Sequence, residues 1–364
     1  MLVMPLLLLA LAPPAGLESP TSAEFCGRCH QAILGAWKLS AHAQAMESRL
    51  FQDALEVAET KFGSPARHTC LKCHAPIAVD KGDLSLRQKV SWEGITCDYC
   101  HSVKDVSLAG VNPRALVEYS MIKHGPIKDA QSMAHGTAYS EVHTSAAICA
   151  PCHEYRNTLG FPVLTTYSEW KGSHYAKDGK ACQSCHMYRT AGDVVDPRVM
   201  QTNTPINLHQ MPGSHSLEQL AKTISAQLSA SRDGDQVRVQ VVVTNRAAGH
   251  YVPTGSPLRQ LILDVKADSF AGQHFQEHRV YARRVADENG TPIEQEHLAF
   301  MSAAKVLSDT RLAPDEKRTE SFTFAIPAGK QTRVTATLRY FYSPFARTES
   351  QKLVTFLSMS RLVQ

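Results

Sequence analysis

The chain has no concentrated basic tract and, beyond its N-terminus, no apolar run long enough to cross a bilayer. Its 38 lysines and arginines and 34 acidic residues give a formal net charge of +4, spread along the sequence. This balance is too mild to predict nucleic-acid binding, and the missing runs predict no transmembrane segment in the mature chain. Hydrophobic residues make up 43%, which is enough for a folded core and argues against disorder.

No cysteine falls outside one repeated pattern, Cys-x-x-Cys-His. We number its five copies sites 1 to 5 in chain order: Cys26, Cys29 and His30; Cys70, Cys73 and His74; Cys97, Cys100 and His101; Cys149, Cys152 and His153; Cys182, Cys185 and His186. The pattern is the c-type haem attachment signature. Two thiols on one turn of chain meet the two vinyl groups of a porphyrin, and the next residue places its imidazole under the iron as proximal ligand. The sequence therefore predicts five covalently attached c-type haems.

Other uses of the cysteines fit the pattern less well. Disulfide bonds do not require a histidine after every second cysteine. Structural zinc uses Cys-x-x-Cys pairs in twos, whereas five pairs is an odd number. A thioredoxin-like redox motif occurs once, in a βαβ setting. No Cys-x-x-Cys-Lys motif is present, which excludes the lysine-ligated catalytic haem of one nitrite reductase family.

The first 23 residues have the features of an export signal. An apolar run from Leu6 to Leu11 breaks at Pro13-Pro14 and is followed by small residues, although the usual positive charge before the run is missing. We expect residues 1–23 to be an approximate signal peptide and the mature protein to be periplasmic or extracellular. Haem attachment of this type also takes place outside the cytoplasm.

The sequence predicts an α+β protein of two domains. Residues 24–216 hold all five sites, are rich in glycine, proline and histidine, and show few long periodic helices. We expect a haem-cored domain of short helices and many loops, in which porphyrins supply the apolar interior. Its helices are predicted at Ala32–Ser40, Ala43–Glu59 and Ser168–Ala176.

Residues 217–364 lack cysteine and alternate polar with apolar residues in short runs, which is typical of β-strands. Leu217 to Ser231 is predicted as a linking helix, and Asp287–Gly290 as a hairpin turn. We predict an antiparallel β-sandwich of immunoglobulin-like type. Its predicted strands are Gln236–Val243, Leu258–Val265, His278–Val285, Thr319–Ile326 and Arg333–Tyr342.

Residues 24–216 contain histidine at several times its usual frequency, even when the five proximal histidines are left out. A low-potential electron carrier usually has a second histidine on each iron, which closes the haem to substrates. We predict four distal ligands from their position near the sites, namely His42, His135, His174 and His215. His250, which lies in the C-terminal region, is a fifth candidate because of its loop. Four further histidines rank below them: His124, His143, His68 and His209.

His250 lies in a distinctive loop, Gly249-His-Tyr-Val-Pro253-Thr-Gly255, which leaves the first strand of the C-terminal region. One interpretation is a glycine- and proline-built turn in which His250 bonds to backbone. In the other, the loop docks on the haem domain and His250 ligates an iron.

Several stretches resemble multihaem cytochromes related to the tetrahaem cytochrome of nitrifying bacteria, the cytochrome c-552/4-like proteins. The stretches are Trp37–His42, Cys70–Pro76, Glu93–His101, Glu169–Trp170 and Cys182–Met187. The resemblance covers residues 24–216 and implies that His42, His135 and His215 stand where such proteins carry distal ligands. The loop around His250 resembles part of a module appended in some members. A fifth attachment motif departs from the tetrahaem pattern.

Three functions agree with these features. The first is an electron carrier, not a catalyst, that relays electrons between redox partner proteins through mostly bis-histidine haems. The second is a multihaem oxidoreductase with one open haem that acts on a small nitrogen or sulfur compound. The third is a subunit of an extracellular cytochrome filament, or another homo-oligomer, assembled through the C-terminal domain. We favour the first.

Overall fold

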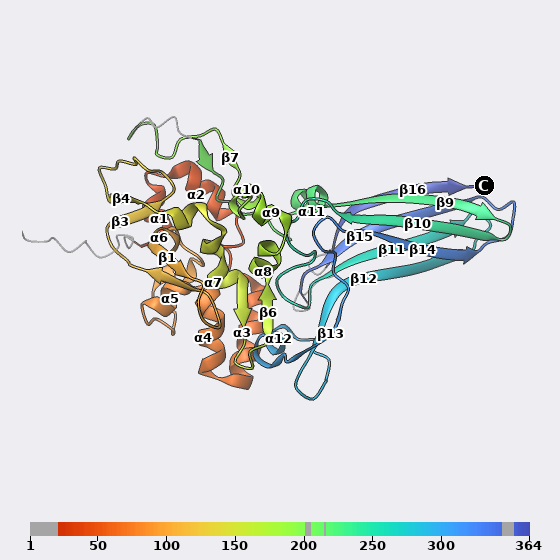
Figure 1. Cartoon of the computed structure of the whole chain (residues 1–364), viewed down its shortest axis with the longest axis horizontal. Coiled ribbons are helices and arrows are strands. Elements are labelled where there is room, and N and C mark those ends of the chain that lie inside the picture. The colour runs from red at the N-terminus through yellow and green to blue at the C-terminus, as the bar shows by residue number, and fades with distance from the viewer. Residues whose placement is uncertain (1–20, 201–204, 215, 344–352) are drawn as a thin grey trace, which may run out of the picture.

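A computed structural model describes residues 21–200, 205–214, 216–343 and 353–364. The chain forms two lobes, a helical N-terminal lobe and a C-terminal lobe of long strands, as Figure 1 shows. Most of the expected signal peptide, and His215, lie outside the described residues. No helix in the described part of the chain is both long enough and apolar enough to cross a membrane.

Short helices dominate the N-terminal lobe, and α3, with 14 residues, exceeds its neighbours in length. The α-helices before residue 217 are α1 (Ala23–Gly27), α2 (Gln31–Lys38), α3 (Arg49–Phe62), α4 (Ser64–His74), α5 (Pro76–Asp80), α6 (Cys97–His101), α7 (Ala150–His153), α8 (Thr166–Lys171), α9 (His174–Lys177) and α10 (Gln183–His186). The 3₁₀ turns are η1 (Lys89–Trp92), η2 (Glu141–Thr144) and η3 (Ala146–Cys149). The helix predicted over Ala43–Glu59 therefore begins later, at Arg49.

Each attachment motif lies on or beside a short helix. On a helix, two cysteines three residues apart lie on the same face. Side-chain caps start two of these helices. The Ser22 hydroxyl accepts a hydrogen bond from the N–H of Phe25, and the Thr96 hydroxyl accepts one from the N–H of Tyr99. The caps fix the first turn that carries the thiols of sites 1 and 3.

A small apolar core joins α3 to the helix that carries site 2. Met46, Leu55, Leu71, Ala75 and Ala78 are its buried members, together with Leu86. At the helix junction, Gly63 ends α3 with a positive φ of 68°, so the chain turns directly into α4. This core fixes α4 against the longest helix of the lobe.

The strands of the N-terminal lobe pair in twos. They are β1 (Val103–Ser107) with β2 (Arg114–Val117), β3 (Ile122–Gly125) with β4 (Gly136–Tyr139), β5 (Glu154–Arg156) with β6 (Pro162–Thr165), and β7 (Arg189–Thr190) with β8 (Ile206–Asn207). The β3–β4 pair is parallel and the others are antiparallel. Such small ribbons leave the interior of the lobe to something other than a sheet.

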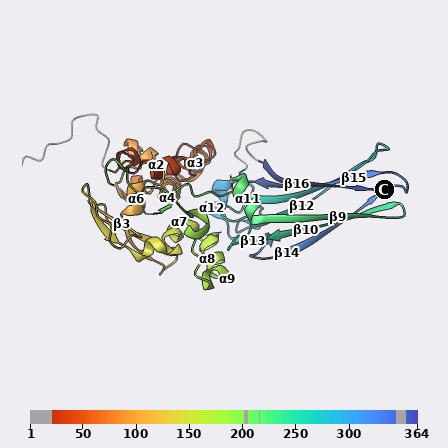
Figure 2. The same cartoon turned by 90° about the horizontal axis from the view of Figure 1, so that it is seen from above.

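The C-terminal lobe contains two antiparallel sheets. In the first, the order is β14 (Lys317–Ala325), β10 (Gln236–Asn245), β9 (Ile224–Asp233). In the second, it is β13 (Lys305–Asp309), β12 (His274–Ala286), β11 (Gln260–Ser269), β15 (Thr332–Phe341), β16 (Leu353–Val363). The inward residues of both sheets form one core, which includes Val239, Leu263 and Val334. Figure 2 shows these strands running side by side from above.

One C-terminal prediction is wrong. The helix expected over Leu217–Ser231 ends early, because α11 covers only Leu217–Thr223 and Ile224 begins β9. Ile224 and Leu228 are buried in the sheet core and pair with β10, so tertiary packing overrides the helical pattern there. The immunoglobulin-like topology stays a prediction.

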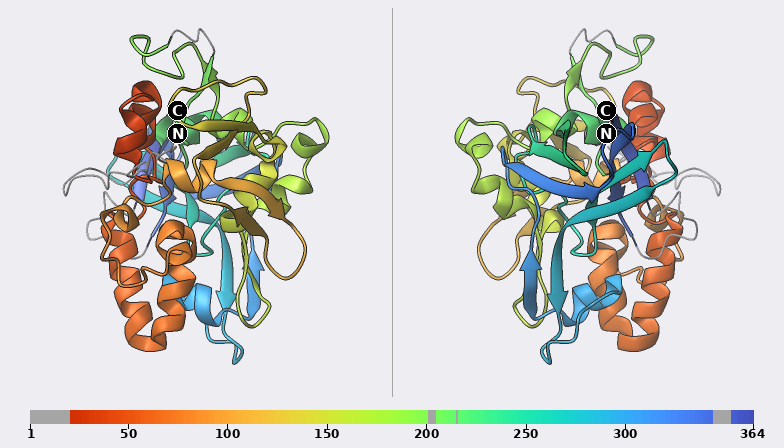
Figure 3. Two further views of the ribbon diagram at one scale, coloured as in Figure 1. Left: turned by 90° about the vertical axis from the view of Figure 1, so that its left-hand side faces the viewer. Right: turned by 90° about the vertical axis from the view of Figure 1, so that its right-hand side faces the viewer.

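The two lobes share apolar contacts at their junction. Phe161 and Val163 of the N-terminal lobe pack in one cluster with Val285, Ile293 and Ala299 of the C-terminal lobe. Ala299 belongs to α12 (Glu296–Ser302), which lies beside the lower ends of the long helices in Figure 3. A hydrogen bond of 2.7 Å from the buried Asn157 amide to the carbonyl of Ala303 crosses the same junction. The domain boundary predicted at residue 217 therefore coincides with the start of α11 but not with a gap in packing.

Candidate haem-attachment site

A cavity of about 1880 Å³ occupies the N-terminal lobe and extends to the junction with the C-terminal lobe. Cysteine and histidine residues from all five sites line it, and so does the loop that carries His250. All ten cysteines are free thiols, standing where the thioether sulfurs of attached haems would be. The lobe therefore has an interior lined by attachment chemistry instead of a continuous apolar core.

Thiols of different sites meet in pairs. The sulfur of Cys26 in site 1 lies beside that of Cys97 in site 3, and the sulfur of Cys73 in site 2 lies beside that of Cys152 in site 4. A third pair joins site 4 to site 5 through Cys149 and Cys182. The sites are therefore neighbours in the order 1 to 3, 2 to 4 and 4 to 5.

Four of the five proximal histidines face a second histidine ring at nearly one distance. A metal ion lies roughly 2 Å from each imidazole nitrogen, and each nitrogen lies about 1 Å from its ring centre, so two imidazoles on one ion have centres about 6 Å apart. The observed separations of the ring centres are 6.3, 6.3, 6.3 and 6.4 Å. The pairs are His30 with His135, His153 with His42, His101 with His209, and His186 with His250.

Backbone carbonyls orient these rings. The Nδ1 atoms of His30, His101 and His186 each lie 2.6 Å from a carbonyl oxygen, those of Val194, His124 and Pro212 respectively. Nδ1 of His209 lies 2.6 Å from the carbonyl of Asn207, and those of His135 and His250 lie 2.9 Å from the carbonyls of Gly136 and Tyr251. Because a carbonyl only accepts, Nδ1 carries the proton, which leaves Nε2 of the neutral ring for a metal.

Burial favours the neutral form of five of the eight paired imidazoles. It lowers the pKa of His42 and His209 to about 4 and the pKa of His153 to about 3. Burial also lowers the pKa of His101 and His250. Neutral imidazole is the form that ligates iron, so the donor set fits the haem that the motifs predict.

A glycine clears the space for His42. The backbone carbonyl of His42 accepts a hydrogen bond from the N–H of Ile95, and a Cβ atom on Gly94 would lie 2.1 Å from that same oxygen. Gly94 also has a φ of +68°. The stretch just before site 3 therefore fixes the distal side of site 4.

Site 2 differs from the others. The His74 ring stacks on Phe51, with ring centres 3.8 Å apart, and burial lowers the pKa of His74 to about 4. Within the described residues, no second histidine ring faces it at about 6 Å in the manner of the other four sites. His215, expected as a distal ligand, lies outside the described residues.

The structure corrects the role of His174. Its Nδ1 lies 2.9 Å from an Asp315 oxygen and its Nε2 3.9 Å from an Asp178 oxygen, and the side chain is 45% exposed. Carboxylates on the surface therefore hold this ring, and position just before site 5 was a misleading guide.

The lower-ranked histidines divide. His209, ranked last from the sequence, faces His101. His143 stacks on His101 as well, at 5.6 Å, but its Nε2 lies 3.0 Å from the carbonyl of Cys100 and its Nδ1 is buried without a partner. His124 contributes its carbonyl to His101, and His68 is exposed on α4. Sequence spacing carried no signal that separates His209 from His143.

The described residues offer no site for structural zinc. Among the described residues, no three or more histidine, cysteine or acidic side chains converge on a common point as a structural zinc ion requires. The five attachment motifs, and the cavity that their cysteines and histidines line, are the features expected of a multihaem c-type cytochrome.

Comparisons with known proteins agree with this class. Residues 25–102 match the family model described as cytochrome c554 and c-prime. The chain shares its fold with a penta-haem cytochrome c552 from Thermochromatium tepidum: the TM-score is 0.75 at 23% identity, and the match covers 94% of this chain and 98% of that one. No curated protein matches the chain.

Two further solved structures match part of the chain at low TM-scores. The hypothetical protein PH1083 from Pyrococcus horikoshii OT3 matches 40% of this chain and 99% of its own, at 14% identity and a TM-score of 0.19. The structural genomics target SoR45 matches 38% of this chain and 84% of its own, at 8% identity and a TM-score of 0.20.

Proposed function

We propose that the chain is an exported pentahaem cytochrome that relays electrons between redox partner proteins. The single observation that carries the proposal is the set of four histidine pairs at 6.3–6.4 Å, each built on a proximal histidine of an attachment motif. Two neutral imidazoles on one iron close it to substrates and suit it to electron transfer. When bound, each haem supplies one-electron chemistry whose potential the axial ligands and burial set.

The order of the sites supports a relay. The thiol contacts join site 1 to site 3, and sites 2 and 5 both to site 4. Cys100 of site 3 also lies near Cys149 and Cys152, so sites 3 and 4 are neighbours. The chain thus holds its attachment sites in one connected series, 1–3–4–5, with site 2 beside site 4.

The setting of this relay follows from how the haems are attached. Thioether formation at Cys-x-x-Cys-His takes place outside the cytoplasm, so we place the mature protein in the periplasm or beyond the cell. The donor and acceptor are redox partner proteins that meet the exposed margin of the N-terminal lobe; Cys185 of site 5 is an exposed attachment cysteine.

One observation favours a second function. The histidine of site 2 stacks on Phe51, and none of the described histidine rings faces it across an iron position. An iron with one open side would suit a multihaem oxidoreductase that acts on a small nitrogen or sulfur compound. Site 2 is therefore the place where carrier and enzyme differ.

Carbon monoxide binding to the reduced holoprotein tests both functions, because the gas binds only an iron with an open position. The relay predicts four low-spin haems that bind none. Replacing His209→Ala opens site 3 and adds one bound carbon monoxide per chain, whereas the matched variant His143→Ala, which removes a ring at the same place, adds none. Binding at two or more haems of the unaltered protein would contradict the relay, and binding at none would remove the enzyme.

A further inference from the structure

A carboxylate from the N-terminal lobe is buried at the junction of the two lobes. Glu169 on α8 has a side chain that is only 6% exposed. Its Oε1 accepts hydrogen bonds from the hydroxyl of Thr165 at 2.6 Å and from Nη1 of Arg311 at 2.7 Å. Its Oε2 accepts from the N–H of Tyr251 at 3.2 Å and from the hydroxyl of Thr254 at 2.8 Å. Three of these four donors belong to the C-terminal lobe.

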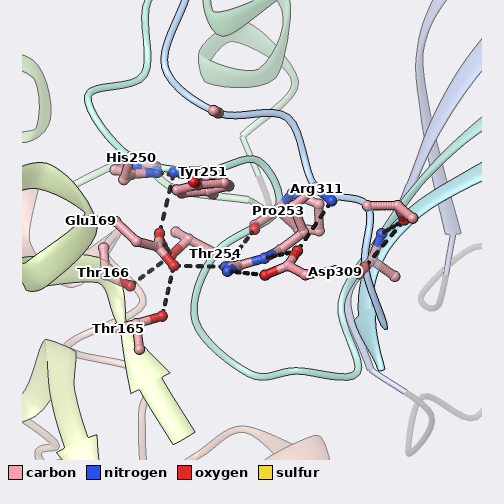
Figure 4. A network of polar contacts seen from close by, with 12 residues as sticks. Thr165, Thr166, Glu169, His250, Tyr251, Pro253, Thr254, Asp309 and Arg311 are labelled. Carbon is pink, nitrogen blue, oxygen red and sulfur yellow. Dashed lines mark hydrogen bonds and ion pairs between the residues drawn. The ribbon is translucent and has the colours of Figure 1, made fainter. Parts of the chain in front are cut away.

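The cation of this network comes from the chain just after β13. Arg311 is 8% exposed and donates through Nε and Nη2 to both oxygens of Asp309, at 2.9 and 2.8 Å. Its guanidinium also lies 4.8 Å from the centre of the Tyr251 ring. Figure 4 shows Arg311 between Asp309 on one side and Glu169 on the other. The planar guanidinium of Arg311 thus joins both carboxylates and packs against Tyr251, which belongs to the loop from Gly249 to Gly255.

The loop held in this way carries His250. Tyr251 and Thr254, the residues that Glu169 contacts, follow His250 by one and four positions. On the other side of His250, Gly249 lies so close to α8 and α9 that a Cβ there would come within 3.1 Å of Tyr175 and 3.3 Å of Trp170. The buried amide of Asn245 donates to the carbonyl of His250 at 3.1 Å. Contacts therefore fix the backbone of His250 from both directions.

This bracing matters because His250 faces His186 across the iron position of site 5, with ring centres 6.4 Å apart. The Tyr251 residue joins the two roles: its N–H binds Glu169 and its carbonyl lies 2.9 Å from Nδ1 of His250. A shift of the loop would therefore both move the ring and turn it. Ligand geometry of this kind depends on the groups behind the ligand.

We propose that Glu169 is a positioning residue for the distal ligand of site 5, holding the His250 loop in place through Tyr251, Thr254 and Arg311. The inference rests on the proposed function, since it takes His250 as an axial ligand. It assigns the C-terminal lobe a part in haem ligation, fixed by an ion pair that spans the junction. An ion pair buried this deeply is a weak source of stability by itself, so its value lies in geometry.

The test compares full-length holoprotein variants by carbon monoxide binding and by the high-spin signal of the oxidised form. We expect Glu169→Ala to release the loop and add up to one bound carbon monoxide per chain, with Glu169→Gln intermediate because an amide keeps one acceptor oxygen. His250→Ala sets the full effect, one additional carbon monoxide. Should Glu169→Ala fail to fold, Glu169→Gln and Arg311→Lys supply the same readout.

A matched control separates positioning from general loss of stability. Asp264 is 6% exposed and accepts a hydrogen bond from Nε of Arg339 at 2.6 Å within the five-stranded sheet. Asp264→Asn breaks an ion pair whose carboxylate is about as buried as Glu169 and which lies away from the loop, so we expect a lower melting temperature with unchanged carbon monoxide binding. If both Glu169 variants bind as much carbon monoxide as the unaltered protein while His250→Ala binds more, this inference alone is overturned. If His250→Ala binds no additional carbon monoxide, the assignment of His250 as a ligand is overturned as well.

Discussion

At the scale of single residues, two conditions separate His250 from His174: a ring nitrogen held by a backbone carbonyl, and a ring that faces a proximal histidine. His250 meets both conditions, because Nδ1 bonds to backbone while the ring faces His186. The two interpretations of its loop, backbone bonding and docking on the haem lobe, are therefore compatible. His174 meets neither, since Asp315 and Asp178 hold its two nitrogens. His174 was predicted from its position just before site 5, whereas His250 was predicted from the loop that carries it.

Gly94→Ala tests how His42 is placed. The new Cβ would overlap the carbonyl oxygen of His42, so we expect the segment to shift and site 4 to bind carbon monoxide. The control Gly82→Ala shares a positive φ, 71°, but its Cβ would meet no atom within 4 Å. It should cost about 1–2 kcal/mol of backbone strain without opening a haem. Equal carbon monoxide binding by both variants would contradict the role of Gly94.

At the scale of elements, the helices that carry the sites depend on small local cores. Leu55 of α3 is 3% exposed and packs in the cluster that fixes the helix of site 2. Val57 of the same helix is 42% exposed. Packing of α3 is thus one-sided, and the two residues separate burial from helix propensity.

Leu55→Ala should lower the free energy of unfolding by about 2–5 kcal/mol, because it leaves a cavity in the cluster. The matched variant Val57→Ala should change it by no more than about 0.5 kcal/mol. Denaturant titration of the holoprotein, followed by far-ultraviolet circular dichroism, measures both. Similar losses for the two variants would show that the cluster does not hold α3.

A carboxylate ties together the loop between α5 and η1. Asp83 accepts hydrogen bonds from the N–H groups of Arg87 and Gln88, both at 2.9 Å, and from the hydroxyl of Ser91 at 2.7 Å. These bonds favour the ionised form and lower the pKa of Asp83. The stabilisation is therefore complete above the pKa of an unfolded aspartate and is lost as the pH falls through the lower folded value.

We expect Asp83→Asn to melt earlier than the unaltered protein at neutral pH and to approach it on acidification. Melting temperatures recorded from pH 7 downwards measure the difference. A gap that stays constant or widens towards low pH would contradict the assigned role of the carboxylate.

The elements were predictable to different degrees. Attachment motifs and alternating strands such as β10 could be predicted because each depends on local spacing. The start of β9 could not, since Ile224 is placed by its pairing with β10 and not by its neighbours in sequence. The distal histidines were only partly predictable for the same reason: His209 reaches His101 across a distance of more than 100 residues.

At the scale of the whole molecule, the two lobes pack against each other as one unit. They share an apolar cluster around Phe161 and Ile293, and the loop that carries His250 lines the cavity of the N-terminal lobe. The C-terminal lobe is therefore more than an appended module. Its removal exposes part of that cluster and takes away the distal ring of site 5 together.

A chain shortened to residues 1–216 should consequently bind one more carbon monoxide than the full chain and melt at a lower temperature. Full-length His250→Ala is the control, because it opens site 5 while keeping the junction. We expect the two proteins to bind equal amounts of carbon monoxide and the shortened one to lose more of its melting temperature. A shortened chain with the binding of the unaltered protein would show that the lobes are independent.

Intact-mass spectrometry of the denatured holoprotein counts the haems that are covalently attached to the chain, which we expect to be five. The protein is made in a host that exports it and attaches c-type haem, and non-covalent haem is removed by denaturation before the measurement. We expect the mass of the processed chain plus five haems, and a loss of one haem when both cysteines of any one site are replaced by alanine. A holoprotein that carries four haems or fewer, with free thiols left at a complete motif, would contradict this expectation.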